Sequence, residues 1–234
     1  MGNSNEVYNS ILEIMDRHSP CLFGIADISY SDYASQYKCA LVIAVPHKKI
    51  MTKDVYSEEE LDELICKACI DCDGIISQVA DFCREQNIEY HIPPIAQESE
   101  KSLVAPFSYK FAAVNAGLGW IGKNDLLITK EYGPRVRLAA ILLGFNLPVG
   151  KPIKNIKCDD KCNYCVEACP YNFLKGVKWD VNKYRDELID YHSCNNKRSL
   201  YIKKHGRKNA CGLCMVSCPF GVVKEWSNKV TSGL

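Results

Sequence analysis

Two cysteine runs in the last third of the chain restrict its fold more than any other feature. Each run has the spacing Cys-x-x-Cys-x-x-x-Cys-Pro. The first consists of Cys162, Cys165, Cys169 and Pro170, and the second of Cys211, Cys214, Cys218 and Pro219. One more cysteine precedes each run, Cys158 the first and Cys194 the second. Because so specific a pattern occurs twice between residues 158 and 219, we interpret it as two sets of metal ligands.

This spacing is the ligand pattern of bacterial-type ferredoxins, in which the last cysteine of each run binds the other [4Fe-4S] cluster. Under that rule one cluster takes Cys158, Cys162, Cys165 and Cys218, and the other takes Cys194, Cys211, Cys214 and Cys169. Two departures occur: Cys158 stands one residue further from its run than the regular pattern has, and a long insertion follows Cys194. Loops tolerate both. A four-cysteine zinc ribbon is the alternative, but it requires neither the Cys-Pro ending nor the third cysteine of each run.

The other six of the fourteen cysteines are predicted to be core residues. Cys66, Cys69 and Cys72 have the spacing of a third ligand set, but they lie within a predicted long helix and no Cys-Pro pair follows them. Buried cysteine is a common small core residue, so we favour core packing over ligation there. The same interpretation applies to Cys21, Cys39 and Cys83, which lie in apolar segments.

Composition and charge are those of an ordinary globular protein. The 234 residues are 47% hydrophobic and 24% charged, with a formal net charge of +1, so any electrostatic attraction must come from a local patch. The N-terminus lacks the pattern of a secretory signal, and no apolar run is long enough to span a bilayer. We therefore expect reduced thiols, a cytoplasmic location and no membrane association.

Hydrophobic periodicity predicts a mixed α+β fold. The predicted helices are 7–17, 57–87 with a possible break at Gly74, and 107–116. The predicted strands are 22–28, 39–46, 88–92, 125–130 and 136–145, the last two joined by a turn at 131–134 into an antiparallel hairpin. We expect residues 93–106 to form a loop and residues 147–157 to form a linker.

A glycine-rich segment covers residues 117–122. Its sequence, Gly-Leu-Gly-Trp-Ile-Gly, matches the dinucleotide-binding pattern Gly-x-Gly-x-x-Gly. That motif requires a strand before it and a helix after it, whereas here a helix precedes and a strand follows. The dinucleotide interpretation therefore fails, and on its own the pattern indicates a tight turn.

The longer string 116–124, followed by the apolar residues 126–128 and the two Cys-Pro runs, resembles the epoxyqueuosine reductase family and its relatives, the reductive dehalogenases. The resemblance covers about residues 20–226. It implies a nitroreductase-like, cobalamin-binding domain at 1–150 and a ferredoxin-like domain with two [4Fe-4S] clusters at 151–234. It also implies that one segment lies against the corrin, namely Gly117, Leu118, Gly119, Trp120, Ile121, Gly122, Lys123 and Asn124.

Departures from the family bear on the substrate. The acid that the family places two residues before an Ala-Pro pair is replaced by Leu103, which precedes Ala105-Pro106. The printed chain ends at Leu234, so we expect the family's C-terminal helical repeats to be missing. The chain also lacks Asp-x-His-x-x-Gly, the string that ligates cobalt through histidine. A cobalamin bound here would therefore lack that histidine ligand. Because the acid and the repeats are missing, we expect a small-molecule or corrinoid substrate, and neither epoxyqueuosine nor a nucleic acid.

Several polar residues are candidates for proton transfer or partner binding. Tyr109 and Tyr132 flank the glycine-rich segment and could donate a proton, with Lys123 and Asp125 as alternatives. Six basic residues lie between two ligands of one cluster: Lys197, Arg198, Lys203, Lys204, Arg207 and Lys208. They could dock an acidic ferredoxin or flavodoxin as electron donor, they could bind RNA phosphate, or they could be a solvated loop.

Three hypotheses about function follow. The first is a cobalamin-dependent iron-sulfur oxidoreductase that passes electrons through two clusters to a corrinoid and on to a small substrate. The second is a non-catalytic corrinoid-reducing or electron-transfer protein that serves a partner. In the third, another cofactor such as a flavin occupies the N-terminal domain.

Overall fold

The chain folds into two compact units, each built from three segments. The computed structural model describes residues 4–95, 103–154, 158–197 and 211–222. The sheet unit comprises Met1–Pro46, Ala68–Leu118 and Arg137–Ile153, and the cysteine unit comprises His47–Lys67, Gly119–Val136 and Lys154–Leu234. The sequence predicts one boundary between residues 150 and 151. The last crossing between the units falls close to it, but segments 47–67 and 119–136 also join the cysteine unit.

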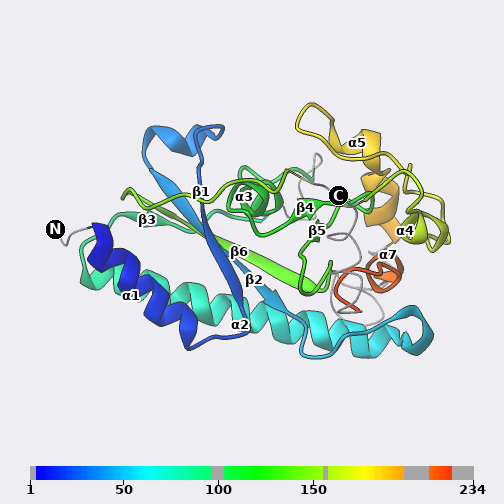
Figure 1. Cartoon of the computed structure of the whole chain (residues 1–234), viewed down its shortest axis with the longest axis horizontal. Helices are drawn as coiled ribbons and strands as arrows, with labels where there is room; N and C mark the ends of the chain where they lie inside the picture. Colours follow the sequence, from blue (N-terminus) through cyan, green and yellow to red (C-terminus); the bar gives the residue numbers. More distant parts are fainter. Residues whose placement is uncertain (1–3, 96–102, 155–157, 198–210, 223–234) are drawn as a thin grey trace, which may run out of the picture. The chain divides into compact units, whose positions relative to one another are not determined.

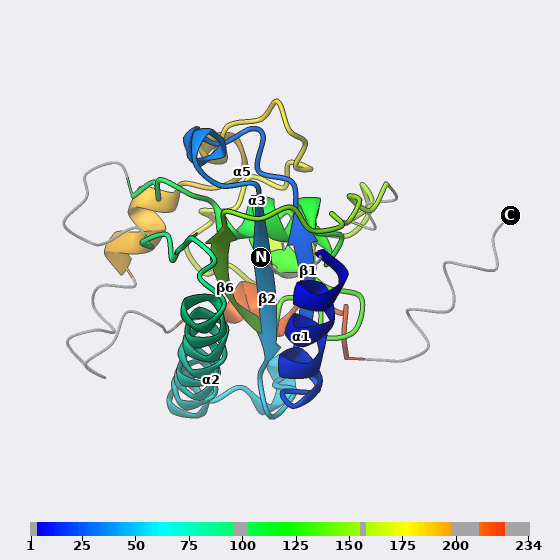
Figure 2. The ribbon, with the colours of Figure 1, turned by 90° about the vertical axis from the view of Figure 1, so that its left-hand side faces the viewer.

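The sheet unit is organised around a four-stranded sheet with the strand order β1-β2-β6-β3 (Figure 1). These strands are β1 (Leu22–Ala26), β2 (Cys39–Pro46), β3 (Tyr90–His91) and β6 (Val136–Leu143). β1 pairs antiparallel with β2, with Leu22 opposite Ala44, and β3 pairs antiparallel with β6, with Tyr90 opposite Leu143. Helices α1 (Ser4–Asp16) and α2 (Glu58–Glu85) run along one side of this sheet (Figure 2).

Successive side chains of β2 point to opposite faces of the sheet, so the two faces pack against different helices. Cys39, Leu41, Ile43 and Val45 belong to the main hydrophobic core, together with buried residues of α1 and α2. The residues between them, Ala40, Val42 and Ala44, point to the opposite face because successive side chains of a strand alternate. Helix α3 (Tyr109–Asn115) contacts β1 and β2. The small side chains of this face leave room for α3 to approach closely.

Helix α2 is continuous at Gly74, where the sequence predicted a possible break. Ser57 Oγ accepts the Glu60 N–H at 3.3 Å, and three glutamates follow in the first turn, which the positive end of the helix favours. Gly74 is exposed, and the helix continues through it to Glu85. Cys72 and Cys83 are buried in the core, whereas Cys66 and Cys69 are half-buried.

The predicted hairpin of residues 125–130 and 136–145 is wrong. β5 (Leu127–Ile128) instead pairs with β4 (Trp120–Ile121) in a separate two-stranded sheet, and β6 lies between β2 and β3. The turn itself closes, because Thr129 and Gly133 exchange both backbone hydrogen bonds. β6 carries buried apolar residues on both faces, and a strand of that kind is more stable inside a larger sheet.

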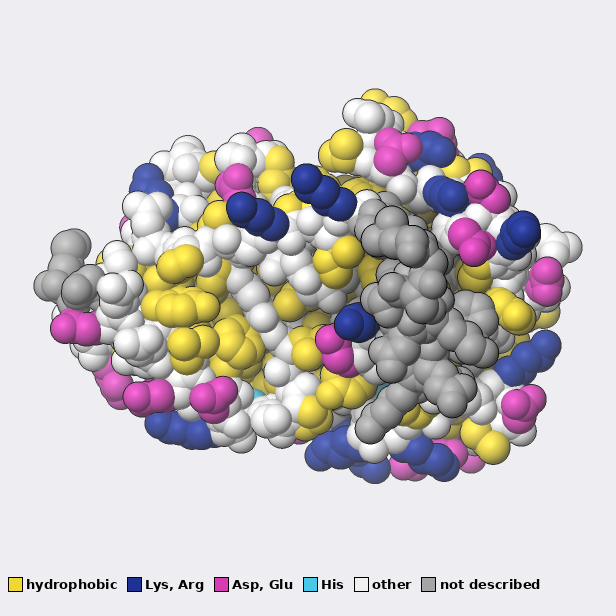
Figure 3. All heavy atoms as spheres, in the orientation of Figure 1, with side chains coloured by type: hydrophobic (Ala, Val, Ile, Leu, Met, Phe, Trp, Pro, Cys, Tyr) yellow, Lys and Arg dark blue, Asp and Glu magenta, His cyan; other side chains and the backbone are white. Residues whose placement is uncertain are grey.

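The distribution of charged side chains on the surface is consistent with the small net charge. On the face shown in Figure 3, basic and acidic side chains are interspersed, and apolar side chains gather over part of it. Among the described helices, none combines the length and the apolar character needed to cross a membrane.

The close approach of α3 to the sheet gives a test of the fold. A Cβ atom at Gly24 would lie 2.8 Å from the Ala116 carbonyl oxygen and 3.1 Å from the Ala116 Cβ. Gly24→Val should therefore lower the free energy of unfolding by about 2 kcal/mol, because overpacking displaces backbone. Urea unfolding of the anaerobic protein, followed by circular dichroism, measures this change. Gly74→Ala is the control: no atom crowds that site, and the variant should be more stable by about 0.5–1 kcal/mol. Equal stability of Gly24→Val and the parent chain would contradict the proposed packing.

Candidate metal centre

The two cysteine runs fold as structural repeats within the cysteine unit. Helix α4 (Tyr164–Glu167) follows the first cysteine of one run, and α7 (Leu213–Val216) follows the first cysteine of the other. Cys165 and Cys214 are the second residues of these helices, which contact each other. Three residues after the last cysteine of each run, the backbone has positive φ, at Asn172 (54°) and Gly221 (77°). The two runs, which have the same cysteine spacing, thus also have the same local backbone structure.

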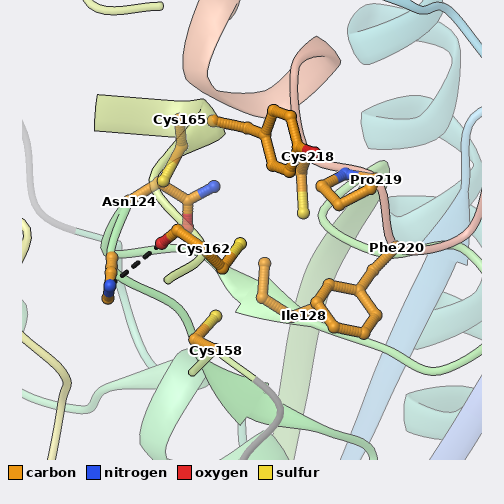
Figure 4. Close-up of a pocket in the computed structure, with 10 residues that line it drawn as sticks. Asn124, Ile128, Cys158, Cys162, Cys165, Cys218, Pro219 and Phe220 are labelled. Carbon is orange, nitrogen blue, oxygen red and sulfur yellow. Dashed lines mark hydrogen bonds between the residues drawn. The ribbon is translucent and has the colours of Figure 1, made fainter. Parts of the chain in front are cut away.

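Four cysteines line one pocket in this unit. They are Cys158, Cys162, Cys165 and Cys218, and their sulfur atoms surround a common space (Figure 4). The pocket holds about 290 Å³ of empty space, part of it open to solvent. Cys218 belongs to the second run, so the structure brings together the set that the crossover rule predicts. Ile128, Pro219 and Phe220 provide an apolar part of the wall.

Four thiols around a common space match the number of ligands of a [4Fe-4S] cluster. Within the described ranges, no three Cys, His, Asp or Glu side chains converge as closely as a single metal ion requires. In a [4Fe-4S] cluster each of four thiolates binds its own iron atom, so the sulfurs stand around the metal group instead of meeting at a point. A pocket with four thiols on its wall therefore fits the donor set of such a cluster.

The remaining predicted ligands gather around Cys214. Burial raises the pKa of this thiol above its ordinary value, and the nearby thiols of Cys211, Cys194, Cys165 and Cys169 raise it further. Cys194 lies in the helical residues 191–197. Three of the four neighbours are the partners that the crossover rule gives to Cys214, and Cys165 connects this group with the first pocket.

Burial makes these free thiols hard to ionise, and the neighbouring thiols add to this effect. Burial raises the pKa of Cys165 to about 11, with contributions from the nearby Cys158 and Cys162. Burial likewise raises the pKa of Cys218 to about 12. Without metal these thiols are protonated at neutral pH. Bound metal cations favour the thiolate and offset the repulsion between the four sulfurs, so the arrangement is typical of a metal site.

Lys123 and Asn124, the last two residues of the string 116–124, and the following Asp125 hold different parts of the cysteine unit. Lys123 Nζ donates to the Cys162 carbonyl at 2.9 Å and to Asn163 Oδ1 at 3.0 Å. Asn124 Nδ2 donates to the Cys214 carbonyl at 3.2 Å. Arg185 Nε donates to Asp125 Oδ2 at 2.8 Å. The string that the resemblance associates with a corrin thus contacts both cysteine runs.

The glycines of this string are required by contacts within the protein. A Cβ at Gly119 would collide with the Ile128 carbonyl, and one at Gly122 would lie 2.8 Å from Asn124 Oδ1. Gly117 has φ +79°, and its Cβ would lie 2.8 Å from the Lys151 carbonyl oxygen. Residues 119–124 are buried. Close approach of protein backbone and side chains therefore explains these glycines. A contact between this segment and a corrin stays a prediction of the resemblance.

Arg135 is a site residue that the sequence analysis missed. Its side chain is 1% exposed, and its guanidinium donates to four carbonyl oxygens. The acceptors and distances are Met51 at 2.8 Å, Phe220 at 2.9 Å, Val216 at 3.0 Å and Cys218 at 2.9 Å. Three of these carbonyls belong to the end of the second cysteine run. The available signal was an arginine directly before the apolar run of β6.

The candidate proton donors are not gathered in the described pocket, except Lys123. Tyr109 belongs to the sheet unit, where its hydroxyl donates to the Pro93 carbonyl at 2.5 Å and burial raises its pKa to about 12. Tyr132 belongs to the cysteine unit, and its backbone N–H donates to Thr129 Oγ1 at 3.1 Å. Of the six basic residues, only Lys197 lies within the described residues. Its Nζ is 5.1 Å from the centre of the Tyr171 ring.

Gly119 provides a test of this arrangement. Gly119→Ala would place a methyl group against the Ile128 backbone and separate β4 from β5, which flank Lys123 and Asn124. We expect the anaerobically reconstituted variant to hold less than half of the iron of the parent chain, measured per chain after desalting. Gly176→Ala is the control. It meets no atom closer than 3.8 Å and adds only the strain of φ +72°, about 1–2 kcal/mol, so iron should be retained. Normal iron in Gly119→Ala would contradict the role given to this string.

Comparison with known sequences supports the predicted clusters. Residues 157–223 match the family model described as a 4Fe-4S dicluster domain. The chain is 41% identical over 117 residues to the epoxyqueuosine reductase of Aliivibrio fischeri, an alignment covering 50% of this chain and 31% of the relative. It is 36% identical over 126 residues to that of Gloeobacter violaceus, covering 51% and 38%. It is 30% identical over 132 residues to the tetrachloroethene reductive dehalogenase of Dehalobacter restrictus, covering 50% and 23%. The aligned part is thus less than two fifths of each relative.

Solved structures show the same fold. A selenomethionine-labelled epoxyqueuosine reductase aligns with a TM-score of 0.62 at 17% identity, covering 95% of this chain and 67% of that chain. A catabolic reductive dehalogenase aligns with a TM-score of 0.67 at 19% identity, covering 90% and 31%. The comparisons confirm the resemblance to both families: the chain has their fold, is similar in sequence over about half its length, and contains a 4Fe-4S dicluster domain.

Proposed function

We propose that the protein is an iron-sulfur oxidoreductase that passes electrons through two [4Fe-4S] clusters to a corrinoid and on to a small substrate. The observation that carries the proposal is the pocket lined by Cys158, Cys162, Cys165 and Cys218, because it joins thiols from both runs. The grouping of Cys214 with Cys169, Cys194 and Cys211 supports a second ligand set. The matched reductases support the oxidoreductase class.

The clusters would supply one-electron transfer, and the chain would hold them in place. Cys165 and Cys214 lie on helices α4 and α7, which contact each other, so the two proposed ligand sets are neighbours. Lys123 holds the loop of the first run through Cys162, and Asn124 holds the second run through Cys214. One buried segment thus fixes both loops, which favours electron exchange at a constant separation.

The proposal that a corrinoid accepts the electrons rests on similarity to other proteins. One solved reductive dehalogenase, whose title describes B12-dependent dehalogenation, aligns with a TM-score of 0.67 at 18% identity. Residues 119–124 are buried, whereas Gly117 and Leu118 are half-buried, so within this segment a corrin would contact Gly117 and Leu118 most readily. The electron donor would be an acidic ferredoxin or flavodoxin in a reducing cytoplasm, docking at the basic residues 197–208.

A second candidate function is that of a non-catalytic protein that reduces a corrinoid or carries electrons for a partner. Two described residues, Leu103 and Tyr109, favour this candidate. Leu103 occupies the position of the family acid, and leucine cannot transfer a proton. The Tyr109 hydroxyl donates to Pro93, and burial raises its pKa to about 12. Neither residue is suited to proton donation.

Iron content tests the two ligand sets. Parent protein reconstituted without oxygen should hold about eight iron atoms per chain, four for each cluster. Cys218→Ala and Cys169→Ala should each reduce this to about four, since each removes one ligand of a different cluster. Electron paramagnetic resonance of each reduced variant should then show an isolated cluster. Cys83→Ala, at a buried core thiol, should keep about eight. Stoichiometric zinc with almost no iron in the parent protein would refute the proposal.

Cobalamin binding and reduction test the corrinoid step that the candidate functions share. We expect one equivalent of added cobalamin to bind under anaerobic conditions and to become Co(I) when the clusters are reduced, as seen in the visible spectrum. We also expect no turnover of RNA containing epoxyqueuosine, because Leu103 cannot supply a proton. A bound but unreduced cobalamin would exclude the corrinoid-reducing functions, and robust turnover would show that another group replaces the acid.

A further inference from the structure

Two buried cations stand beside the same set of cysteines. Lys123 is 3% exposed and lines the pocket of Cys158, Cys162, Cys165 and Cys218. Arg135, 1% exposed, donates to the carbonyl of Cys218 itself. Both residues belong to segment 119–136, which joins the cysteine unit although it is distant in sequence from the first cysteine run.

The described acceptors of these two cations are neutral oxygens. Lys123 Nζ donates to the carbonyl oxygens of Cys162 and Asp160 and to the amide oxygen of Asn163. Arg135 donates to four carbonyl oxygens. The Asp160 carboxylate is exposed and pairs with Lys178 at 2.9 Å. Lys178 lowers the pKa of this carboxyl, and Lys123 makes a smaller contribution in the same direction. Hydrogen bonds to neutral oxygens satisfy the N–H groups but do not neutralise the charges.

A buried charge is costly unless an opposite charge compensates it. A [4Fe-4S] cluster with four thiolate ligands is a net anion, and each added electron makes it more negative. An anionic cluster between Cys162 and Cys218 would therefore compensate both cations. In return, both cations would stabilise the reduced cluster.

We propose that Lys123 and Arg135 compensate the charge of the cluster held by Cys158, Cys162, Cys165 and Cys218 and thereby raise its reduction potential. This inference rests on the proposed function, since it requires that cluster. The step is a one-electron reduction of [4Fe-4S]²⁺ to [4Fe-4S]⁺ by an external one-electron donor, and no bond forms or breaks. Both residues act through the field they create at the cluster.

The two cations differ in what else they do. The Arg135 guanidinium spans the carbonyls of Val216, Cys218 and Phe220, so it also holds the backbone on both sides of a ligand. Lysine cannot reproduce this fork. Lys123 holds the first run through Cys162. In the free protein, Arg135 lowers the pKa of Cys218 and Lys123 lowers that of Cys162, both against the larger effect of burial.

The experiment is a potentiometric titration of the anaerobically reconstituted full chain, monitored by electron paramagnetic resonance, with iron counted in each sample. Lys123→Gln keeps a hydrogen-bond donor and removes the charge. We expect its cluster to be about tenfold harder to reduce, a fall of about 59 mV in midpoint potential. Lys123→Arg keeps the charge and should titrate like the parent chain. Arg135→Gln should shift in the same direction, whereas Arg135→Lys should keep the potential but lose iron faster.

Lys178→Gln is the matched control, because this exposed lysine pairs with Asp160 in the same loop. Its midpoint should not change. Unchanged midpoints in both Lys123→Gln and Arg135→Gln would overturn the inference, as would an equal shift in Lys178→Gln. If Arg135→Gln does not retain iron, the midpoint potential of Lys123→Gln alone tests the inference. Parent protein that holds no clusters would instead refute the proposed function, so the two failures are distinguishable.

Discussion

The transfer of Cys218 from the second cysteine run to the pocket of the first is the constraint on which the cysteine unit depends. In the proposed ligand sets each run supplies a cysteine to the other, which would hold both runs in one fixed register. A bound metal group would contribute to this, because its ligands would come from both runs. The protein contributes a second set of constraints through segment 119–136.

That segment explains why a glycine-rich string precedes a metal domain. Lys123, Asn124 and Arg135 each donate to a backbone carbonyl of a cysteine run. Such hydrogen bonds fix the main chain of the loops and leave the sulfurs free for metal. The glycines allow β4 and β5 to approach closely enough for these side chains to reach their acceptors.

Local patterns were the reliable part of the sequence analysis. The predicted helices 7–17 and 57–87 correspond to α1 and α2, and the predicted strands 22–28 and 39–46 correspond to β1 and β2. The pairing of β6 could not be derived in this way. A turn at 131–134 suggested a hairpin, but the partner of a strand depends on which distant surface buries both its faces. Arg135 was missed for a similar reason, because its acceptors lie more than eighty residues away in sequence.

The sequence by itself determined three things: eight candidate ligand cysteines, six of them in two Cys-Pro runs; a resemblance that the comparisons confirm; and leucine in place of an acid at residue 103. Only the tertiary structure decided which groups surround those donors. It filled the spaces beside Gly119 and Gly122 with protein, and it placed Lys123 and Arg135 against the cysteine runs. The physical reason is that ligand spacing is local along the chain, whereas burial and charge compensation depend on segments that meet only when the chain folds.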